Sequence, residues 1–357
     1  MSQHETYMHR CLQLARLGAG HTAPNPMVGA VLVHEYRIIG EGHTQPYGGP
    51  HAEVMCINSV QDADKPLLSS ATLYVSLEPC SHFGKTPPCS DLIIRSGIPQ
   101  VVIGCADPFE AVNGKGIAQL EAAGVQVTVG VLANECWAVN QHFFTYHTQQ
   151  RPYVILKWAE SANGQIGTIG KRTAISGPIA NRLVHRWRSE VMAIMVGGNT
   201  ALTDNPQLTT RLWKGKNPTR IVVAGHTQLP AHLQLFNEEA PTLVFSNEQK
   251  VQHPHASYYP LPTGDTAIDE LLGQLYQLRI NSVLVEGGAK LLQSFINSGL
   301  WDEARIITNS SLVIEDGIAA PQIPQKQFIH QQILGSDSIA YFTNLQNAHS
   351  SFVIHHS

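Results

Sequence analysis

Three residues of the types that bind zinc lie in the first quarter of the chain, and a glutamate accompanies one of them. His51 and Glu53 belong to the segment HAE, while Cys80 and Cys89 lie within the segment PCSHFGKTPPC. One imidazole and two thiolates supply three ligands and leave the fourth tetrahedral position of a zinc ion open for water, as in catalytic sites. Bound zinc lowers the pKa of that water toward neutrality and yields a hydroxide nucleophile, so the pattern predicts hydrolytic chemistry.

Glu53 follows His51 by two residues at the expected start of a helix, so its carboxylate can reach the water without binding the metal. The pattern HxE, followed by PC and a second cysteine, is the signature of zinc-dependent base deaminases, in which the glutamate transfers protons. Here eight residues separate the cysteines instead of two. We therefore expect a longer loop, stiffened by Pro87 and Pro88, to return Cys89 to the metal.

Each of these residues also has a purely structural interpretation. Cys80 and Cys89 could be buried thiols, and His51 could cap a helix or fill a core position. A non-enzymatic protein stabilised by zinc is a further alternative, and it would need His43 or His82 as a fourth ligand. The combined pattern is much more specific than any of its members, and it favours catalytic zinc.

The elements that must position these residues alternate between strands and helices. This order predicts an α/β domain with helices packed on a mainly parallel sheet. The first two strands are close enough in the chain to form a hairpin. The expected strands are 28–34, 37–41, 71–76, 100–105 and 125–129, and the expected helices are 7–17, 51–60, 89–96, 115–123 and 134–146.

A second α/β domain is expected beyond residue 150, because 357 residues are too many for one ordinary core. We place the two domains at residues 1–148 and 151–357. Strands are expected at 153–157, 193–196, 220–223, 242–245, 282–285 and 304–308, and helices at 178–189, 267–278 and 290–298.

Two features of the second domain could bind phosphate groups. No GxGxxG follows an expected strand, but Gly287 and Gly288 lie between a strand and a helix, where backbone amides can approach a pyrophosphate. Glycines at such turns are equally often structural. Arg188 and the segment DNPQLTTR at 204–211 form a second cluster, since arginine binds phosphate through paired hydrogen bonds. Its alternative is that Arg186 and Arg188 only solvate a helix face.

The composition limits the class of partner. The net charge is −4 with 23 Lys and Arg residues, so there is no broad cationic field for a long nucleic acid. The first residues lack the apolar core of a signal peptide, and no apolar run approaches membrane-spanning length. The six cysteines are expected to be thiols or metal ligands. We expect a cytoplasmic protein acting on a small molecule, with no nucleic-acid or membrane partner.

At the residues discussed above, the chain resembles the bifunctional riboflavin-biosynthesis deaminase/reductase family. The similar segments are APNPMVG, GEGHTQPYGGPHAE and LEPCSHFGKTPPC in the first half, and YVILKWAES, HRWRSE, MVGGNTALTDNPQLTTR and LVEGGAKLLQSFI in the second. Eight residues between the cysteines are normal in that family. The resemblance implies a cytidine-deaminase-like three-layer domain followed by a dihydrofolate-reductase-like domain that uses NADPH.

The resemblance also implies two consecutive reactions on one phosphorylated pyrimidine. The first removes the 2-amino group of 2,5-diamino-6-(5-phosphoribosylamino)pyrimidin-4-one, and the second transfers a hydride that converts the ribosyl group to a ribityl chain. Substrate contacts would come from Asn25, His82, Lys85 and Thr86 in the first domain, and from Arg188, Leu208, Arg211 and Glu286 in the second. Contacts with NADPH would come from Ala159, Ala174, Thr200, Asp204, Gly288, Ala289, Lys290, Leu291 and Leu292.

The second half departs from this family at four positions. Asn163 stands where aspartate is usual, Arg172 where serine is common, Ala174 where tryptophan is common and Ala224 where aspartate is common. None of these changes removes an evident catalytic acid, because hydride transfer depends mainly on how the cofactor is positioned. They nevertheless leave one alternative function open, a deaminase of nucleosides or transfer RNA with an inactive C-terminal domain. The sequence leaves open a homodimer through the reductase domain.

Overall fold

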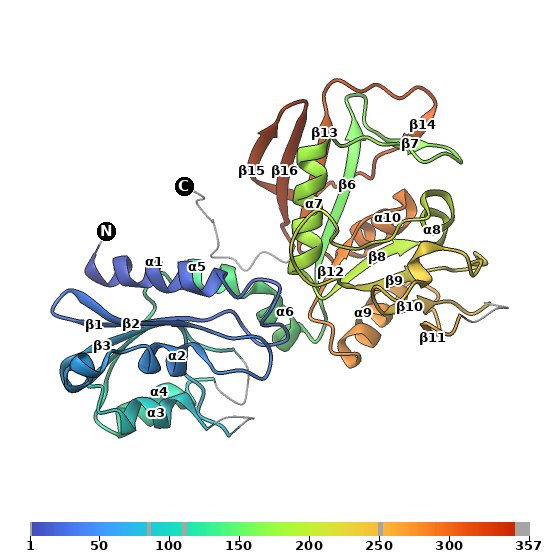
Figure 1. The fold of residues 1–357 in the computed structure, drawn as a ribbon. Helices are drawn as coiled ribbons and strands as arrows, with labels where there is room; N and C mark the ends of the chain where they lie inside the picture. The colour runs from blue at the N-terminus through green and yellow to red at the C-terminus, as the bar shows by residue number, and fades with distance from the viewer. Residues whose placement is uncertain (1, 84–86, 109–112, 249–252, 347–357) are drawn as a thin grey trace. The chain divides into compact units, whose positions relative to one another are not determined.

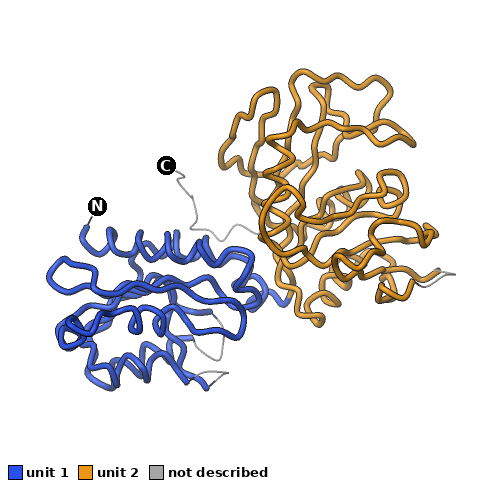
Figure 2. The backbone as a smooth tube through the Cα atoms, in the orientation of Figure 1, with its two compact units in different colours: residues 1–150 blue, residues 151–357 orange. Residues whose placement is uncertain are grey.

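The computed structural model consists of two compact units, Met1–Gln150 (unit 1) and Arg151–Ser357 (unit 2), coloured separately in Figure 2. The structure describes residues 2–83, 87–108, 113–248 and 253–346. One apolar cluster forms the core of unit 1, and three form that of unit 2. No helix within the described ranges is long and apolar enough to cross a membrane.

Unit 1 is a three-layer α/β/α sandwich, which confirms the predicted fold (Figure 1). Its sheet has the strand order β2-β1-β3-β4-β5. The strands are β1 (Gly29–His34), β2 (Arg37–His43), β3 (Thr72–Leu77), β4 (Gln100–Cys105) and β5 (Gln126–Val129). The sheet is mixed, because β1 pairs antiparallel with both β2 and β3, whereas the pairs β3–β4 and β4–β5 are parallel.

Helices cover both faces of this sheet. Helix α1 (Gln3–Arg16) contacts β1 and β3, and α5 (Ala133–Val139) contacts β4 from the same side. The opposite face is covered by α2 (Ala52–Asn58), α3 (Cys89–Arg95) and α4 (Lys115–Ala122), with a 3-10 helix η1 (Asp62–Ser70) between α2 and β3. Helix α2 begins directly after His51, and α3 begins at Cys89.

Unit 2 is built on a nine-stranded sheet with the order β11-β10-β9-β8-β12-β6-β13-β16-β15. In this spatial order, the neighbouring strands β11, β10, β9, β8, β12, β6 and β13 all run parallel, and β16 and β15 add an antiparallel edge. The strands are β6 (Tyr153–Ser161), β8 (Ala193–Gly197), β9 (Thr219–Val223), β10 (Thr242–Phe245), β11 (Ala256–Tyr259), β12 (Ser282–Val285), β13 (Glu303–Asn309), β15 (Lys326–Leu334) and β16 (Asp337–Asn344). A separate two-stranded sheet pairs β7 (Gln165–Thr168) with β14 (Gly317–Ala319).

Alternate residues of the central strands pack against different helices of unit 2, as the two-residue period of a strand requires. Tyr153 and Ile155 of β6 share a core with α7 (Pro178–Glu190), whereas Val154 and Leu156 share one with α9 (Ala267–Gln277) and α10 (Ala289–Ser298). Two further short helices are α8 (Gly198–Asp204) and the 3-10 helix η2 (Gln234–Phe236). The parallel strands with helices on both faces agree with the second α/β domain expected from the sequence.

The single helix expected over 134–146 is two helices, α5 and α6 (Gln141–Gln149), separated at Asn140. The side chain of Asn140 explains the break. Its Oδ1 accepts a hydrogen bond of 2.7 Å from Met27 N, and its Nδ2 donates one of 2.9 Å to Met27 O. Because this buried pairing fixes the backbone of a distant loop, a tertiary contact outweighs the helical pattern of the local sequence.

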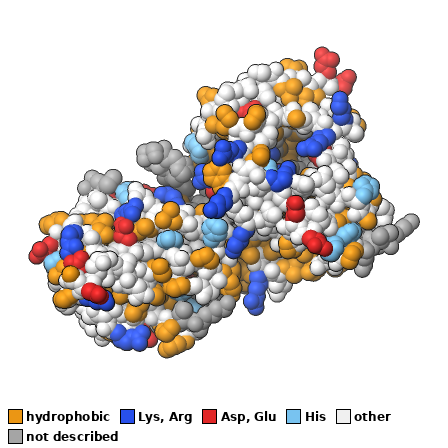
Figure 3. All heavy atoms as spheres, in the orientation of Figure 1, with side chains coloured by type: hydrophobic (Ala, Val, Ile, Leu, Met, Phe, Trp, Pro, Cys, Tyr) orange, Lys and Arg blue, Asp and Glu red, His pale blue; other side chains and the backbone are white. Residues whose placement is uncertain are grey.

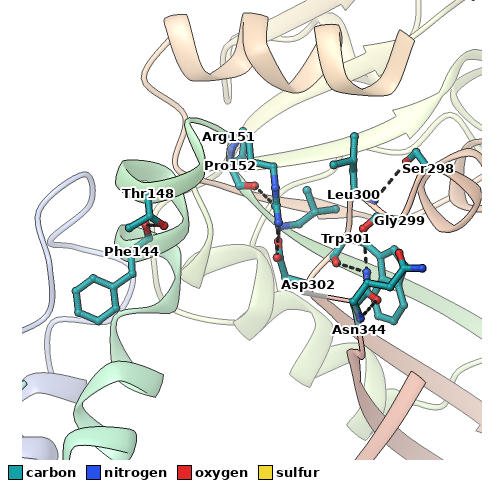
Figure 4. Close-up of polar contacts among 12 residues, drawn as sticks. Phe144, Thr148, Arg151, Pro152, Ser298, Gly299, Leu300, Trp301, Asp302 and Asn344 are labelled. Atoms are coloured by element: carbon teal, nitrogen blue, oxygen red, sulfur yellow. Dashed lines mark hydrogen bonds and ion pairs between the residues drawn. The ribbon is translucent and has the colours of Figure 1, made fainter. Parts of the chain in front are cut away.

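Unit 2 begins with a buried ion pair between Arg151 and Asp302 (Figure 4). Arg151 Nη1 and Nη2 donate to the two carboxylate oxygens over 2.7 and 2.6 Å, and Val154 N donates to one of them over 2.8 Å. Asn344 Nδ2 donates to two carbonyl oxygens of the loop just before Asp302. These contacts join the start of β6 to the start of β13 and the end of β16.

Candidate functional site

Helix α2 brings His51 and Glu53 to the site because two glycines of β2 let the helix lie unusually close to the sheet. A Cβ atom on Gly42 would lie 2.3 Å from Cys56 N, and one on Gly40 would lie 2.6 Å from Cys56 O. Any other residue at these positions would push the helix outward. The glycines of the segment GEGH therefore set the height of α2 above the strands.

His51, Cys80 and Cys89 lie together, with one ligand atom from each within 4.8 Å of the others. His51 Nδ1 lies 3.6 Å from Cys80 Sγ and 3.3 Å from Cys89 Sγ. Tetrahedral zinc with bonds of about 2.3 Å to sulfur and about 2.0 Å to nitrogen would place the nitrogen and each sulfur about 3.5 Å apart. The three donors therefore fit zinc in both chemistry and spacing.

The structural alternatives for these residues find little support in the geometry. His51 is the N-cap residue of α2 but makes no side-chain capping hydrogen bond. Among the residues that the structure describes, neither His43 nor His82 joins the group of potential ligands. A purely structural zinc site would need a fourth protein ligand, and the described part of the chain brings none to this group.

Each of the two thiols shifts the pKa of the other, because they lie close together in a buried site. The hydrogen bond from Cys89 lowers the pKa of Cys80 to about 4, and the same bond together with burial raises the pKa of Cys89. Cys89 is the first residue of α3, and a helix N-terminus favours negative charge. The site is therefore prepared to bind a cation.

Glu53 lies in the first turn of α2, and its side chain is buried with 4% exposure. Burial, reinforced by the negative charge of Cys80, raises the pKa of Glu53 to about 7. A carboxyl group with a pKa near neutrality can both accept and donate a proton. This is the property that a shuttle between water and a leaving amino group needs.

Two of the four residues expected to contact the substrate in unit 1, Asn25 and His82, lie on loops. Asn25 is half-buried in the loop before β1, where its backbone N–H donates to Thr22 O over 2.9 Å. Asn140 was not expected from the sequence, yet its pairing with Met27 holds this same loop two residues beyond Asn25. His82 is exposed. Lys85 and Thr86 lie outside the described residues.

A pocket of about 1010 Å³ opens in unit 2 at the ends of β6, β8, β9 and β12. Gly287 and Gly288 line it, and Gly288 is the N-cap residue of α10 with a φ of 76°. A Cβ atom on Gly288 would lie 3.2 Å from Thr200 Oγ1. All nine residues expected to contact NADPH line this pocket: Ala159, Ala174, Thr200, Asp204, Gly288, Ala289, Lys290, Leu291 and Leu292.

Arg188 of α7 joins Glu286, which lines the pocket, to the loop 204–211. Its Nε and Nη2 donate to the two oxygens of Glu286 over 2.7 and 2.8 Å, and its Nη1 donates to Thr209 O over 3.1 Å. Arg211 Nη1 donates to Thr209 Oγ1 over 2.9 Å. Leu208 is buried next to Thr209 and has a left-handed φ of 57°. All four residues expected to contact the substrate in unit 2 thus belong to one cluster.

Lys157 is a charged residue of this pocket that was not expected from the sequence. Its Nζ lies 3.8 Å from Glu286 Oε2, and burial lowers the pKa of the lysine. Burial alone would raise the pKa of Glu286, but Arg188 and Lys157 bring it below its ordinary value. The available signal was one lysine inside the otherwise apolar strand YVILKWA.

Three of the four departures from the family pattern, Arg172, Ala174 and Ala224, line the pocket. Asn163 instead holds a turn against the chain before β14. Its Nδ2 donates to Ile314 O over 2.9 Å, and its Oδ1 accepts from Ile314 N over 3.2 Å. An aspartate could not donate the first of these hydrogen bonds, so this departure is accommodated by local structure.

Comparison with known proteins agrees with this division into two sites. Residues 1–105 match the cytidine and deoxycytidylate deaminase zinc-binding region, and residues 152–338 match the RibD C-terminal domain. The riboflavin biosynthesis protein RibD of Aquifex aeolicus is 41% identical over 304 residues, which cover 84% of this chain and 84% of that protein. The RibD protein of Escherichia coli is 33% identical over 340 residues, which cover 90% and 92%.

Solved structures extend the similarity to the fold. The diaminohydroxyphosphoribosylaminopyrimidine deaminase/5-amino-6-(5-phosphoribosylamino)uracil reductase of Thermotoga maritima matches with a TM-score of 0.87 at 35% identity, covering 96% of this chain and 98% of that one. RibD of Acinetobacter baumannii matches with a TM-score of 0.88 at 29% identity, covering 96% and 99%. The chain therefore belongs to the RibD family of riboflavin biosynthesis proteins, with a zinc-dependent deaminase domain followed by an NADPH-dependent pyrimidine reductase domain.

Proposed function

We propose that unit 1 removes the 2-amino group of 2,5-diamino-6-(5-phosphoribosylamino)pyrimidin-4-one, and that unit 2 then reduces the ribosyl group of the product with NADPH. The proposal depends most on one observation, the group of His51, Cys80 and Cys89 next to the buried Glu53. Membership of the RibD family supports the order of the two reactions and the identity of the substrate.

In unit 1, His51 Nδ1 and the two thiolates would hold zinc, which when bound activates water for attack on the ring carbon that bears the amino group. Glu53 would accept a proton from the water and deliver it to the departing nitrogen, so that water is consumed and ammonia is released. Asn25 and His82, together with Lys85 and Thr86, would bind the substrate. The burial of Glu53 supports its role, because it keeps bulk solvent from competing for the proton.

In unit 2, the nine residues named above would hold NADPH, with its diphosphate at the N-terminus of α10. A hydride would add to the ribosyl carbon attached to nitrogen, the ring C–O bond would break, and a proton would convert the ring oxygen to a hydroxyl group. Arg188, Leu208, Arg211 and Glu286 would position the substrate, with the arginines binding its phosphate. The bidentate pairing of Arg188 with Glu286 supports a fixed geometry at this end of the pocket.

We further propose that the protein works in the cytoplasm, as a homodimer through unit 2. All six cysteines are free thiols, which suits a reducing compartment. The edge strand β15 exposes Phe328 and Ile333 by 56% and 75%, as expected of a surface that another subunit covers. Sedimentation velocity of the wild type and of Ile333→Lys tests the dimer.

On the face shown in Figure 3, Lys and Arg side chains are scattered among acidic and uncharged groups, in keeping with a small-molecule substrate.

The experiment that tests the two activities is product analysis by mass spectrometry. Purified protein is incubated with the diaminopyrimidine substrate, with and without NADPH. We expect replacement of one amino group by oxygen without NADPH, and the further gain of two hydrogen atoms only with NADPH. Cytidine, guanosine and transfer RNA serve as competing substrates. Deamination of any of these in preference to the phosphorylated pyrimidine would refute the assignment.

A further inference from the structure

Glu78 is a buried carboxylate in unit 1 that has no part in the site described above. It lies two residues before Cys80, and only 4% of its surface is exposed. Within the described residues, four backbone N–H groups donate to it: those of Asp107 and Gly114 to Oε2 over 3.2 and 3.0 Å, and those of Gly116 and Ile117 to Oε1 over 3.0 and 3.3 Å. Such a set of donors fixes the carboxylate in one position.

The last two of these donors belong to the first turn of α4. The N-cap residue of α4 is Gly114, which has no side chain to cap the free N–H groups of the helix. Glu78 supplies the cap from a different part of the chain. Gly116 allows the close approach, because a Cβ atom at that position would lie 2.0 Å from Pro79 O. The first turn of α4 is thus held directly against the residue that precedes Cys80.

Helix α4 in turn contacts the segment that bears the second cysteine. Gln119 Oε1 lies 2.8 Å from Ser90 Oγ, and Gln119 Nε2 donates to Asp91 Oδ1. Ser90 Oγ also lies 3.0 Å from Cys80 O, and Ser90 N donates to the same oxygen over 3.1 Å. Cys89 N donates to Cys80 Sγ over 3.4 Å. Ser90 therefore links both cysteine segments to α4.

We propose that Glu78 is a positioning residue of the metal centre, which acts through α4 and Gln119 to hold Cys80 and Cys89 at ligand spacing. The inference depends on the proposed zinc site, but it assigns a role to residues outside that site. Eight residues separate the two cysteines along the chain, and hydrogen bonds from Cys89 and Ser90 to Cys80 hold the two segments together. The series of contacts from Glu78 through α4 and Gln119 to Ser90 adds a second restraint on the same segments.

Glu78→Gln is the variant that tests this role. Glutamine keeps the size of the side chain but presents an NH₂ group to backbone N–H donors, so some of them lose their partner. Replacing residues that orient metal ligands typically weakens metal affinity by about 10–100-fold. We expect a loss of zinc affinity in this range and a lower deamination kcat with a nearly unchanged KM. Gln119→Met, which removes only the contact with Ser90 and Asp91, should have a smaller effect in the same direction.

Glu121→Gln is the matched control, because it makes the same chemical change on the exposed side of α4. Zinc affinity is measured by competition with a chelator, and ligand geometry by the thiolate-to-metal and d–d absorption bands of the Co²⁺-substituted protein. Reductase activity and thermal unfolding of the metal-free proteins are measured in parallel. Glu78→Gln should alter the Co²⁺ bands and zinc affinity, while Glu121→Gln should leave both unchanged.

Two kinds of failure can be distinguished. If the wild-type protein binds no zinc, the proposed function of unit 1 fails. If the wild type binds zinc but Glu78→Gln only unfolds at lower temperature, with unchanged affinity and Co²⁺ bands, then Glu78 merely stabilises α4 and the inference is wrong. Should Glu78→Gln not fold, Gln119→Met decides: unchanged affinity and Co²⁺ bands in that variant would equally overturn the proposal.

Discussion

The candidate sites of the two units differ in how many residues determine their chemistry. In unit 1, three ligand atoms and one carboxylate must meet at distances set by a metal ion. In unit 2, a pocket of about 1010 Å³ is lined by residues from many segments, and the cofactor would bring the reactive group. A centre of the first kind should tolerate almost no change of residue type. A pocket of the second kind can absorb substitutions such as Ala174 and Ala224 at its wall.

The largest effect is expected from Glu53→Gln. Glutamine is nearly isosteric with glutamate but cannot transfer a proton, and general acid/base groups typically contribute about 10²–10⁴-fold to a rate. We expect deamination to fall by this factor while zinc content and the reductase rate stay at wild-type levels. Deamination and reduction are assayed separately, with Glu121→Gln as the control. A variant that still deaminates at the normal rate would show that the proton passes through another group.

The second-largest effect is expected on the stability of unit 2, from a substitution in a buried ion pair. Asp302→Ala removes one partner of the buried pair with Arg151, which leaves an uncompensated buried cation (Figure 4). Loss of one partner of such a pair typically costs about 3–5 kcal/mol. We expect the free energy of unfolding of unit 2 to fall by this amount, with loss of the reductase at elevated temperature but unchanged zinc binding.

Asp64→Ala is the matched control for that prediction, because Asp64 pairs with Arg37, which is 56% exposed. Surface ion pairs contribute only about 0–1 kcal/mol. Denaturant unfolding, followed separately by zinc release and by reductase activity, distinguishes the two units. Equal effects of the two substitutions would show that the Arg151–Asp302 pair is not a special point of unit 2.

The same contrast explains which features could be predicted from the sequence. The metal group follows from residue types at fixed spacing, and the order of strands and helices in both units follows from periodic apolar segments. Family resemblance led to the two domain folds, which the structure and the comparisons confirm. The residues expected to contact substrate and cofactor remain predictions, although those of unit 2 lie together in the structure.

The missed features depend on contacts between distant parts of the chain. The break at Asn140 requires the backbone of Met27, which lies 113 positions earlier. Glu78 looks like an ordinary polar residue until the first turn of α4 is placed against it. The strands β15 and β16 have mixed polar and apolar faces at the edge of a sheet, where the apolar pattern is weak. Local sequence contains none of this information.

Replacement of the arginines near the pocket should give a smaller effect. Arg211→Ala should lower the reductase kcat/KM by a factor that corresponds to a loss of about 1.5–3 kcal/mol of transition-state stabilisation, the range for hydrogen bonds to charged groups. The affinity for NADPH should change much less. Arg188→Ala should do the same and in addition lower the melting temperature, because Glu286 would lose its bidentate partner. Steady-state kinetics and direct titration of NADPH separate these effects. Wild-type efficiency in both variants would place the phosphate elsewhere.

The smallest effect concerns Arg172, which stands where the family commonly has serine. It lines the pocket, and its positive charge acts to lower the pKa of both Asp204 and Arg211. Because Arg172 is exposed, solvent screens its charge, and groups of this kind contribute about 0–1 kcal/mol. Arg172→Ser should therefore raise the KM for the phosphorylated substrate only several-fold, and added salt should shrink the difference from wild type. Lys171→Ser is the control, because Lys171 is an exposed neighbouring cation that also lines the pocket.

If Arg172→Ser abolishes reduction while Arg211→Ala does not, then Arg172 has taken over the phosphate contact. The tolerance of the pocket to substitution would then be explained by exchange of roles between its arginines.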